Sequence, residues 1–481
     1  MPSPLLTVAR TEARLLRADR TALWVTLLFA AATAYALVTG LDLRAERAEA
    51  ARTILAADAE QWASGEADAD SIEQVMRAEN VPLDTYEWGP RSPYAVGMAY
   101  GRSVTAEPTP LSALAVGQVD LYPVAYEVTA GNRVAVGTSD ALASPLRLAA
   151  GSFDLAFVLL YLLPLLALAL GYDLTASERE RGTLRLVLAQ PLLRRTLVAG
   201  KLLARGGLLA LLVIAATTAG FVASGGGLGP WALWTAATLL YGLFWLGLAA
   251  AVDARGRSAA ANAVVLAVCW LGLGVVFPAA VTLLAGQVHP APTRAAFVAA
   301  TRTAEADITQ RGTEPLAQFL SDHPEMAEAV GDETAAAESF AVMAVARNAA
   351  VAEALEPIVA QFAEQRARQT AFVRTVGALS PSILAHAAFL DLAGTGDAQQ
   401  RRTLDAVETY QEQWRDHFEP LVFADTPFNA ADYPNAPRFT PAPEAPGEAA
   451  RQASGPLVGL ALASLLVLGF GFLFHSRATA P

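Results

Sequence analysis

Six stretches without a charged residue dominate the hydrophobic pattern of this chain. They cover residues 21–41, 155–172, 206–224, 231–252, 258–288 and 455–474. A bilayer crossing takes about 20 predominantly apolar residues, and buried helices of soluble proteins rarely lack charge over such lengths. The third and fourth stretches are separated by the turn-forming glycines of 225–227 and by Pro230. We therefore predict six membrane-spanning helices.

Two long polar segments interrupt these spans. The first, residues 42–154, begins with helical spacing over Leu43–Trp62 and again over Ile72–Arg77. Further on, Val124–Val128 and Arg133–Val136 flank a short turn and predict a β-hairpin. We expect a small α+β insertion after the first span.

The second polar segment, residues 289–454, has apolar positions at helical spacing. The periodic stretches are Phe340–Ala354, Pro357–Val376 and Arg401–Phe418. Pro357 is expected to start or kink a helix, and the apolar stretch Ile383–Leu392 is expected to touch the outer leaflet of the membrane. A proline-rich return then leads to the last span. The predicted fold class is mainly α: a six-span bundle with a small α+β insertion after span 1 and a larger helical insertion after span 5.

Two predictions concern the N-terminal residues. Leucines are interspersed with arginines over residues 4–18, which suits an amphipathic helix at the inner membrane surface; a solvated tail is the alternative. Residues 21–41 form a longer apolar run than a signal peptide needs, and no small-x-small cleavage site follows. An uncleaved anchor is therefore the better interpretation.

The distribution of basic residues predicts the orientation. With six spans, residues 1–20, 173–205, 253–257 and 475–481 share one face. They hold 14 Arg and Lys residues against 6 Asp and Glu, whereas the whole chain has 34 against 46. We therefore expect this face, with both termini, to be cytoplasmic and both insertions to be external. Abundant alanine and arginine are typical of GC-rich bacterial coding, so the expected location is the bacterial cytoplasmic (inner) membrane.

The polar stretch between the second and third spans, residues 173–201, contains the chain's sole lysine, Lys201. Ser177 and Glu180 have capping-box spacing and predict a helix start. Gly182 and Thr183 allow a sharp turn. Leu184, Val187 and Leu188 then give a short helix an apolar edge, which Gln190 and Pro191 end. A short helix with an apolar edge and charged flanks fits a cleft on a soluble partner, although an ordinary basic loop is the simpler reading.

The order Glu-Arg-Gly-Thr-Leu, Gln-Pro and Gly-Lys in this stretch closely resembles the cytoplasmic coupling loop of type-2 ABC transporter permeases. The resemblance is narrower to bacterial members with two large external insertions and no assigned substrate. It assigns the ATPase-facing role to Glu178, Gly182, Thr183, Leu184, Gln190, Pro191 and Lys201. It also implies a second, smaller contact at residues 253–257, through Asp253, Arg255 and Arg257.

Other chemistry finds little support in the sequence. The stretch around Gly200 and Lys201 lacks the preceding glycine and the following Ser or Thr of a phosphate-binding loop. We therefore expect no cofactor on this chain and ATP on a partner subunit. The five histidines have no metal-ligand spacing, and the acidic balance argues against nucleic acid. Pro164, Pro278 and the pair Gly469 and Gly471 in the spans are candidate hinges or close-packing points.

The leading functional interpretation is a permease subunit of an ATP-driven exporter. The resemblance implies a separate ABC ATPase and a second permease, identical or similar, as partners, with membrane lipid around them. An alternative is a transmission protein in which ATP hydrolysis works the external insertions on an envelope partner without transport. A membrane-anchored enzyme is a third possibility, but no catalytic constellation supports it. Transport would place polar residues on a central path, and Asn262 and Thr282 are the candidates.

Overall fold

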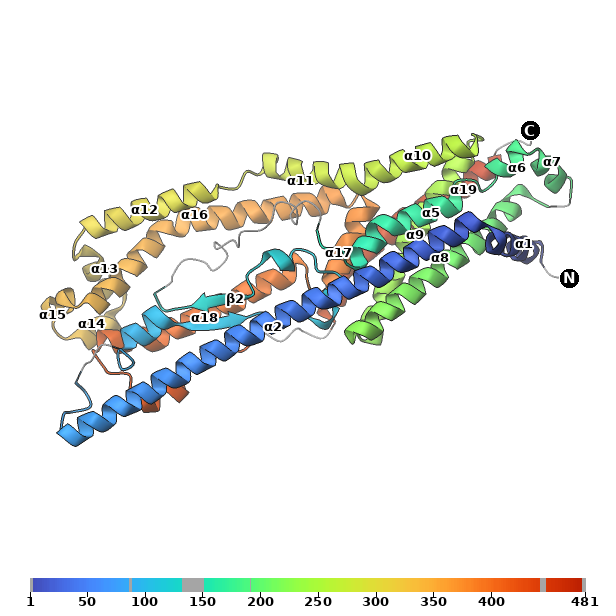
Figure 1. The fold of residues 1–481 in the computed structure, drawn as a ribbon. Coiled ribbons are helices and arrows are strands. Elements are labelled where there is room, and N and C mark those ends of the chain that lie inside the picture. Colours follow the sequence, from blue (N-terminus) through green and yellow to red (C-terminus); the bar gives the residue numbers. More distant parts are fainter. Residues whose placement is uncertain (1–2, 86–88, 132–150, 191, 442–446, 478–481) are drawn as a thin grey trace.

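The computed structural model describes residues 3–85, 89–131, 151–190, 192–441 and 447–477. It confirms a mainly α fold with six helices long and apolar enough to cross a membrane. The spans are α2 (Arg20–Glu79), Leu155–Glu180, α8 (Arg194–Ser224), α9 (Leu228–Asp253), Ala259–Val288 and α19 (Glu448–Arg477). They form a bundle whose one end carries both chain termini, and long helices extend from the other end (Figure 1). We call the first end, with residues 173–193, the loop end.

The first span does not stop where the apolar run stops. Helix α2 continues for 60 residues, from Arg20 to Glu79, or about 90 Å at 1.5 Å per residue. The separate helices predicted over Leu43–Trp62 and Ile72–Arg77 are therefore parts of one rod. Residues 20–79 contain no proline, and alanine, glutamate and arginine follow the apolar run directly, so nothing in the local sequence ends the helix. It ends at Asn80, which adopts the left-handed conformation with φ 61°.

The remaining described part of the first insertion is compact and mostly irregular. Strand β1 (Arg102–Thr105) pairs antiparallel with β2 (Ala125–Val128), with Arg102 opposite Val128. The first predicted strand, Val124–Val128, is therefore present as β2, but it pairs with a strand that precedes it in the chain. The predicted hairpin partner, Arg133–Val136, lies outside the described residues.

The second insertion is helical, as predicted. Its helices are α12 (Arg294–Gln310), α13 (Glu314–Asp322), α14 (Pro324–Val330), α15 (Glu333–Glu338), α16 (Phe340–Gly377), α17 (Pro381–Ala393) and α18 (Asp397–Phe423), followed by the 3-10 helix η7 (Ala430–Asn435). Pro357 lies inside α16, which neither starts nor ends there. Of the two alternatives predicted for Pro357, a helix start is wrong, because α16 begins at Phe340, capped by the Ser339 side chain; a kink at Pro357 stays a prediction.

The two insertions share one hydrophobic core, so they do not form two separate domains. Val96, Met98 and Val128 of the first insertion pack in the same cluster as Trp414 and Phe418 of α18. Gly97 is needed there, because an added Cβ would lie 2.2 Å from Cγ of Phe418. The Trp414 indole N–H donates to the Gly97 carbonyl at 2.9 Å. We call this assembly, with the second half of α2, the polar unit.

Helix α17, which contains the apolar stretch Ile383–Leu392, packs inside the bundle. Leu384, Phe389 and Leu392 are buried in the core of the bundle, packed against α9 and α19. The Phe389 ring stacks on Trp234 of α9, with 4.9 Å between centroids and 16° between planes. The helix has only 13 residues and enters and leaves the bundle from the same side (Figure 1).

Two of the spans contain a π-helical segment. In the second span, η5 (Val158–Leu162) precedes Pro164, and in the fifth, η6 (Gly272–Val276) precedes Pro278. Proline has no N–H, and its ring crowds the carbonyl four residues earlier. An α-helical hydrogen bond is therefore lost just before each proline, and the π-helical segment lies at that point. The predicted hinge positions therefore coincide with real interruptions of the α-helical pattern.

Of the two glycines predicted as close-packing points in the last span, Gly471 lies at a close approach and Gly469 does not, since its added Cβ would meet nothing within 4 Å. An added Cβ on Gly471 of α19 would lie 3.3 Å from the Gly247 carbonyl of α9, so both backbones approach closely there, as small residues permit in membrane helices. The last span is bonded further to α9 through Ser464, whose hydroxyl lies 2.8 Å from the Leu240 carbonyl.

Candidate coupling site

The loop end begins with two short helices joined by a glycine turn. Helices α6 (Ala176–Glu180) and α7 (Thr183–Leu188) flank Gly182, whose φ of 73° is the left-handed conformation expected of the predicted turn. The predicted capping box was wrong, because α6 starts one residue before Ser177 and its N-cap, Thr175, makes no side-chain cap hydrogen bond. Glu180 instead accepts the Ala259 backbone N–H of α10 (Ala259–Leu271) at 2.8 Å.

Asp253, the last residue of α9, supplies the missing cap of α6. Its carboxylate accepts the backbone N–H of Thr175 at 3.0 Å and of Ala176 at 3.1 Å, and it also accepts the Thr175 hydroxyl at 2.5 Å. A carboxylate at a helix N-terminus stabilises both the free N–H groups and the helix dipole. Asp253 is fully buried. Of the three residues expected at a second surface contact, only Arg255 and Arg257 are exposed.

Two more helices meet at Asp253. The Asn262 side chain of α10 donates to Asp253 at 3.2 Å and to the Tyr172 carbonyl at 3.1 Å. Asn262 is buried, so it does not line an open path. On the other side, Nε2 of His475 in α19 lies 3.0 Å from the Ala250 carbonyl and 3.9 Å from Asp253. The start of α6 is thus attached to three spans at one point.

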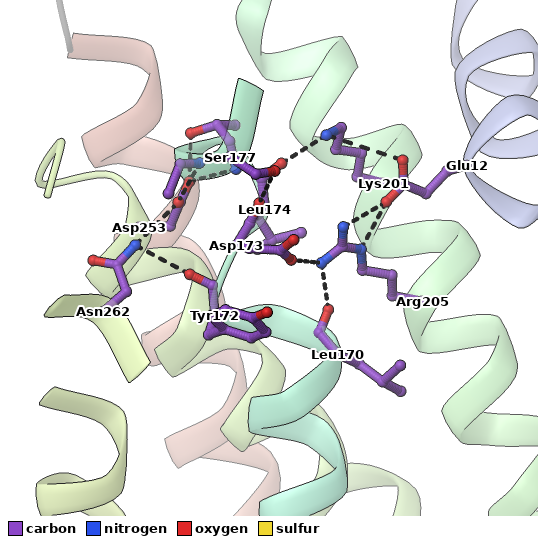
Figure 2. A network of polar contacts seen from close by, with 12 residues as sticks. Glu12, Leu170, Tyr172, Asp173, Leu174, Ser177, Lys201, Arg205, Asp253 and Asn262 are labelled. Carbon is purple, nitrogen blue, oxygen red and sulfur yellow. Dashed lines mark hydrogen bonds and ion pairs between the residues drawn. The ribbon is translucent and has the colours of Figure 1, made fainter. Parts of the chain in front are cut away.

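Lys201 lies inside the protein and not on the surface of the loop. It is 4% exposed, and its ammonium group bonds Glu178 of α6 at 2.8 Å and the Leu174 carbonyl at 2.7 Å (Figure 2). The first helix of the loop is therefore fixed to α8 by an ion pair. Glu178 and Lys201, both predicted from the resemblance, are brought together by the fold.

Beside this pair, Arg205 of α8 joins the N-terminal helix α1 (Pro4–Ala18) to the loop. Its guanidinium bonds Glu12 at 2.6 Å, Asp173 at 2.6 Å and the Leu170 carbonyl at 2.6 Å (Figure 2). Both Glu12 and Arg205 are buried. Buried charges are costly unless paired and hydrogen-bonded, and here each charge has a partner on another element.

The glycine before Lys201, Gly200, is required by the close approach of α1 to α8. A Cβ at Gly200 would lie 2.6 Å from Cγ1 of Val8 and 3.1 Å from the Leu5 carbonyl. Only a residue without a side chain lets α1 approach α8 this closely. The Gly-Lys pair therefore has a structural meaning: Gly200 allows α1 to pack and Lys201 holds the loop.

The exposed face of α7 differs from the predicted one. Leu184 is 2% exposed, whereas Leu186 is 71% exposed. Val187 and Leu188 are half-buried, and Gly182, Thr183 and Gln190 are exposed. Pro191 lies outside the described residues. On α7, therefore, Leu186 and not Leu184 is the strongly exposed leucine.

Glu12, Asp173, Arg205 and Leu186 were missed as site residues. Glu12 and Arg205 are 193 positions apart, and no local spacing relates them. A single acidic residue in an otherwise basic N-terminal helix was the available signal for Glu12. Within the described ranges, no group of three or more His, Cys, Asp or Glu side chains could hold a metal ion.

The six apolar helices indicate a multi-pass membrane protein. A family model described as a domain of unknown function (DUF3526) matches residues 294–442, which lie in the second insertion. A distant relative is the probable ABC transporter permease protein NosY of Pseudomonas aeruginosa, 38% identical over 117 residues. The match covers 21% of this chain and 41% of NosY.

Proposed function

We propose that this chain is the membrane permease subunit of an ATP-driven ABC exporter of the type-2 class, powered by a separate ATPase subunit. One observation carries the proposal: ion pairs and hydrogen bonds fix the stretch 173–201 to α8, α9 and α10, and Arg205 extends the network to Glu12 of α1. A force applied to this loop is therefore applied to the bundle. An ordinary connecting loop needs no such attachment, because connections normally run loosely over the surface.

The surface that would receive the ATPase is the exposed side of α7. Thr183, Arg185 and Leu186 are exposed on it, and Arg255 and Arg257 lie exposed in the neighbouring connection. Leu186 would enter an apolar cleft, and the arginines would meet acidic residues at its rim, the usual arrangement of an apolar anchor with a polar edge.

The partner and location form part of the same proposal. The fifth and sixth spans bury only 17% of their most apolar 18-residue windows, against 72% for α9. Their exposed apolar faces would be covered by lipid and by a second permease, identical or similar. The loop end would face the cytoplasm of a bacterial cell and the polar unit the outside, since the loop end is the basic one.

The test is co-purification of the ATPase with a Leu186→Asp variant. An unpaired carboxylate in an apolar cleft costs several kcal/mol, and a cost of about 3 kcal/mol weakens binding by more than a hundredfold. Leu186 is exposed in the chain itself, so the variant should fold and insert normally. The matched control is Val75→Asp, which places the same charge at a 56% exposed apolar position far along α2.

Equal recovery of the ATPase with Leu186→Asp and Val75→Asp would contradict the proposal. Leu184→Asp would not test docking cleanly, because Leu184 is buried and the carboxylate would disturb the loop itself.

A second candidate function, mechanical transmission without transport, is favoured by helix α2. It runs unbroken from the bundle to the distal part of the polar unit, so movement of the first span is also movement of the unit. Its test is photocrosslinking in cells from a probe at the exposed position Ala57. An ATP-dependent crosslink to an envelope protein would favour transmission, and its absence would favour transport.

A further inference from the structure

A cluster of hydrogen bonds connects α17 to the spans at the end of the bundle opposite the loop end. Tyr241 of α9 is fully buried, and its hydroxyl lies 2.9 Å from the Ser382 hydroxyl of α17. The same hydroxyl lies 2.9 Å from the Leu160 carbonyl of η5. Within an apolar bundle such bonds are retained, because an unpaired polar group costs several kcal/mol. Three separate segments thus meet at one side chain.

The other bonds of this cluster also end on the interrupted segments. The Ser380 hydroxyl, at the start of α17, donates to the Leu273 carbonyl of η6 at 3.2 Å. The Trp270 indole donates to the Tyr161 carbonyl of η5 at 3.2 Å. A π-segment leaves carbonyls outside the regular i→i−4 ladder, and here side chains of other helices use them. Both π-segments are therefore tied to α17, one through α9 and one directly.

Helix α17 is also the link between the two longest helices of the second insertion. It follows α16 after three residues and precedes α18 after three. At its C-terminal end, the Thr109 hydroxyl donates to the Ala393 carbonyl at 2.5 Å, and the Thr395 hydroxyl donates to the Ala115 carbonyl at 2.7 Å. Any shift of α17 must therefore move the helices of the polar unit that flank it.

Helix α9 reaches from this cluster to the coupling site. It carries Trp234 near its start, Tyr241 at its middle and Asp253 at its end, about 28 Å from Trp234 at 1.5 Å per residue. It is the most buried of the six spans. A helix of this kind moves as a rigid body more readily than it bends, since its interior contacts are close-packed.

We infer that α9 and α17 carry movement from the loop end to the polar unit, with the Tyr241–Ser382 hydrogen bond and the Trp234–Phe389 stack as the joint. Movement of α6 displaces Asp253, α9 follows, and α17 transfers the displacement to α16 and α18. The π-segments allow the second and fifth spans to adjust while their bonds to this joint are kept. The inference rests on the proposed function, since an ATPase supplies the movement.

The experiment measures one distance in the polar unit of the assembled complex. Nitroxide labels are placed at the exposed positions Ala57 on α2 and Ala363 on α16, after Cys269→Ala removes the native thiol. The distance is measured by electron–electron double resonance without nucleotide and with Mg-ATP and vanadate. We expect the parent to show a nucleotide-dependent shift and Tyr241→Phe to lose more than half of it while ATPase recovery is unchanged.

Two further variants keep the result interpretable. Ser382→Ala removes only the α17 hydroxyl and leaves the Tyr241 bond to Leu160 intact, so it should reduce the shift with little effect on folding. The matched control is Thr238→Val, one turn away on α9. It removes a buried hydroxyl whose bond, to the Trp234 carbonyl, stays within the helix, and it should keep the full shift.

The outcomes separate the inference from the proposed function. A full shift in both Tyr241→Phe and Ser382→Ala overturns the inference and leaves the permease proposal standing. If the parent shows no nucleotide-dependent shift although the ATPase is bound and active, the inference is likewise overturned and the permease proposal stands. Failure of any ATPase to bind the parent removes the proposed function and the inference with it.

Discussion

Asp253 shows how one buried carboxylate can organise an entire loop. It accepts hydrogen bonds from Thr175, Ala176 and Asn262, which belong to the loop and to α10. Each of these donors lies where water cannot replace the carboxylate. The loop's first helix is therefore defined less by its own sequence than by a residue 78 positions away.

Replacing Asp253 by alanine should destabilise the whole chain. The variant leaves two buried backbone N–H groups and an amide without their acceptor, at about 1–3 kcal/mol each. We expect a clearly lower melting temperature in detergent, measured by fluorescence-detected size exclusion, and loss of the ATPase. Asp68→Ala, at an exposed position of α2, is the control. Identical melting of both variants would show that the cap contributes nothing.

Asp154 makes stability depend on pH. It is buried, and it accepts the backbone N–H groups of Val116 and Phe157 at 2.7 and 2.8 Å. Burial raises the pKa of this carboxyl from its usual 3.8 to about 6. The folded state therefore holds the proton more tightly than the unfolded state, and stability is lost as pH rises through this range. Two pKa units correspond to about 3 kcal/mol.

The measurement is the melting temperature of the parent and of Asp154→Asn between about pH 4 and pH 7. The parent should lose stability across this interval, and the asparagine variant, which cannot ionise, should have a flatter profile. Parallel profiles would exclude Asp154 as the cause.

At the scale of elements, α8 carries two glycines that should respond oppositely to alanine. At Gly200 an added Cβ meets Val8 of α1 at 2.6 Å, whereas at Gly207 it meets nothing within 4 Å. Gly207→Ala should stabilise the helix by about 0.5–1 kcal/mol. Gly200→Ala should push α1 away and lower the melting temperature. Equal effects of the two substitutions would contradict the close approach of α1 to α8.

Helix α7 is too short for the spacing of its apolar residues to predict its buried face. Over six residues, helical spacing identifies an apolar edge but does not tell which leucine faces inward. Leu184, Leu186 and Leu188 are all apolar, and the neighbouring elements decide that Leu184 is buried. In the longer helix α18, Val407, Trp414 and Phe418 recur at helical spacing and are all buried, because several turns must agree.

At the scale of the whole molecule, the shared core predicts that residues 294–442 do not fold cooperatively alone. Their far-UV circular dichroism should be helical, because the periodic pattern is local. The near-UV signal and a sharp thermal transition should be missing, because Trp414 and Phe418 pack against Val96, Met98 and Gly97 of the first insertion. A sharp transition of the isolated segment would show that its own core suffices.

Sidedness is a second whole-molecule prediction. Single cysteines at Ala57 and Gln190, both exposed, are placed in a Cys269→Ala background. In intact cells a membrane-impermeant maleimide should label the cysteine at position 57, and it should label the one at position 190 only after permeabilisation. Labelling at 190 in intact cells would reverse the orientation and remove the basis for a cytoplasmic ATPase.

The sequence by itself determined the features that depend on local chemistry. The six spans follow from apolar length against bilayer thickness, the helical second insertion from its spacing, and the turn at Gly182 from a residue that tolerates positive φ. The tertiary structure alone decided that Lys201, Arg205 and Asp253 are buried, each with a bonding partner on another element. It also decided that α17 packs inside the bundle and that the two insertions share a core. Burial of a charge depends on a partner that supplies the opposite charge or a hydrogen bond, and these partners lie on other elements, up to 193 residues away.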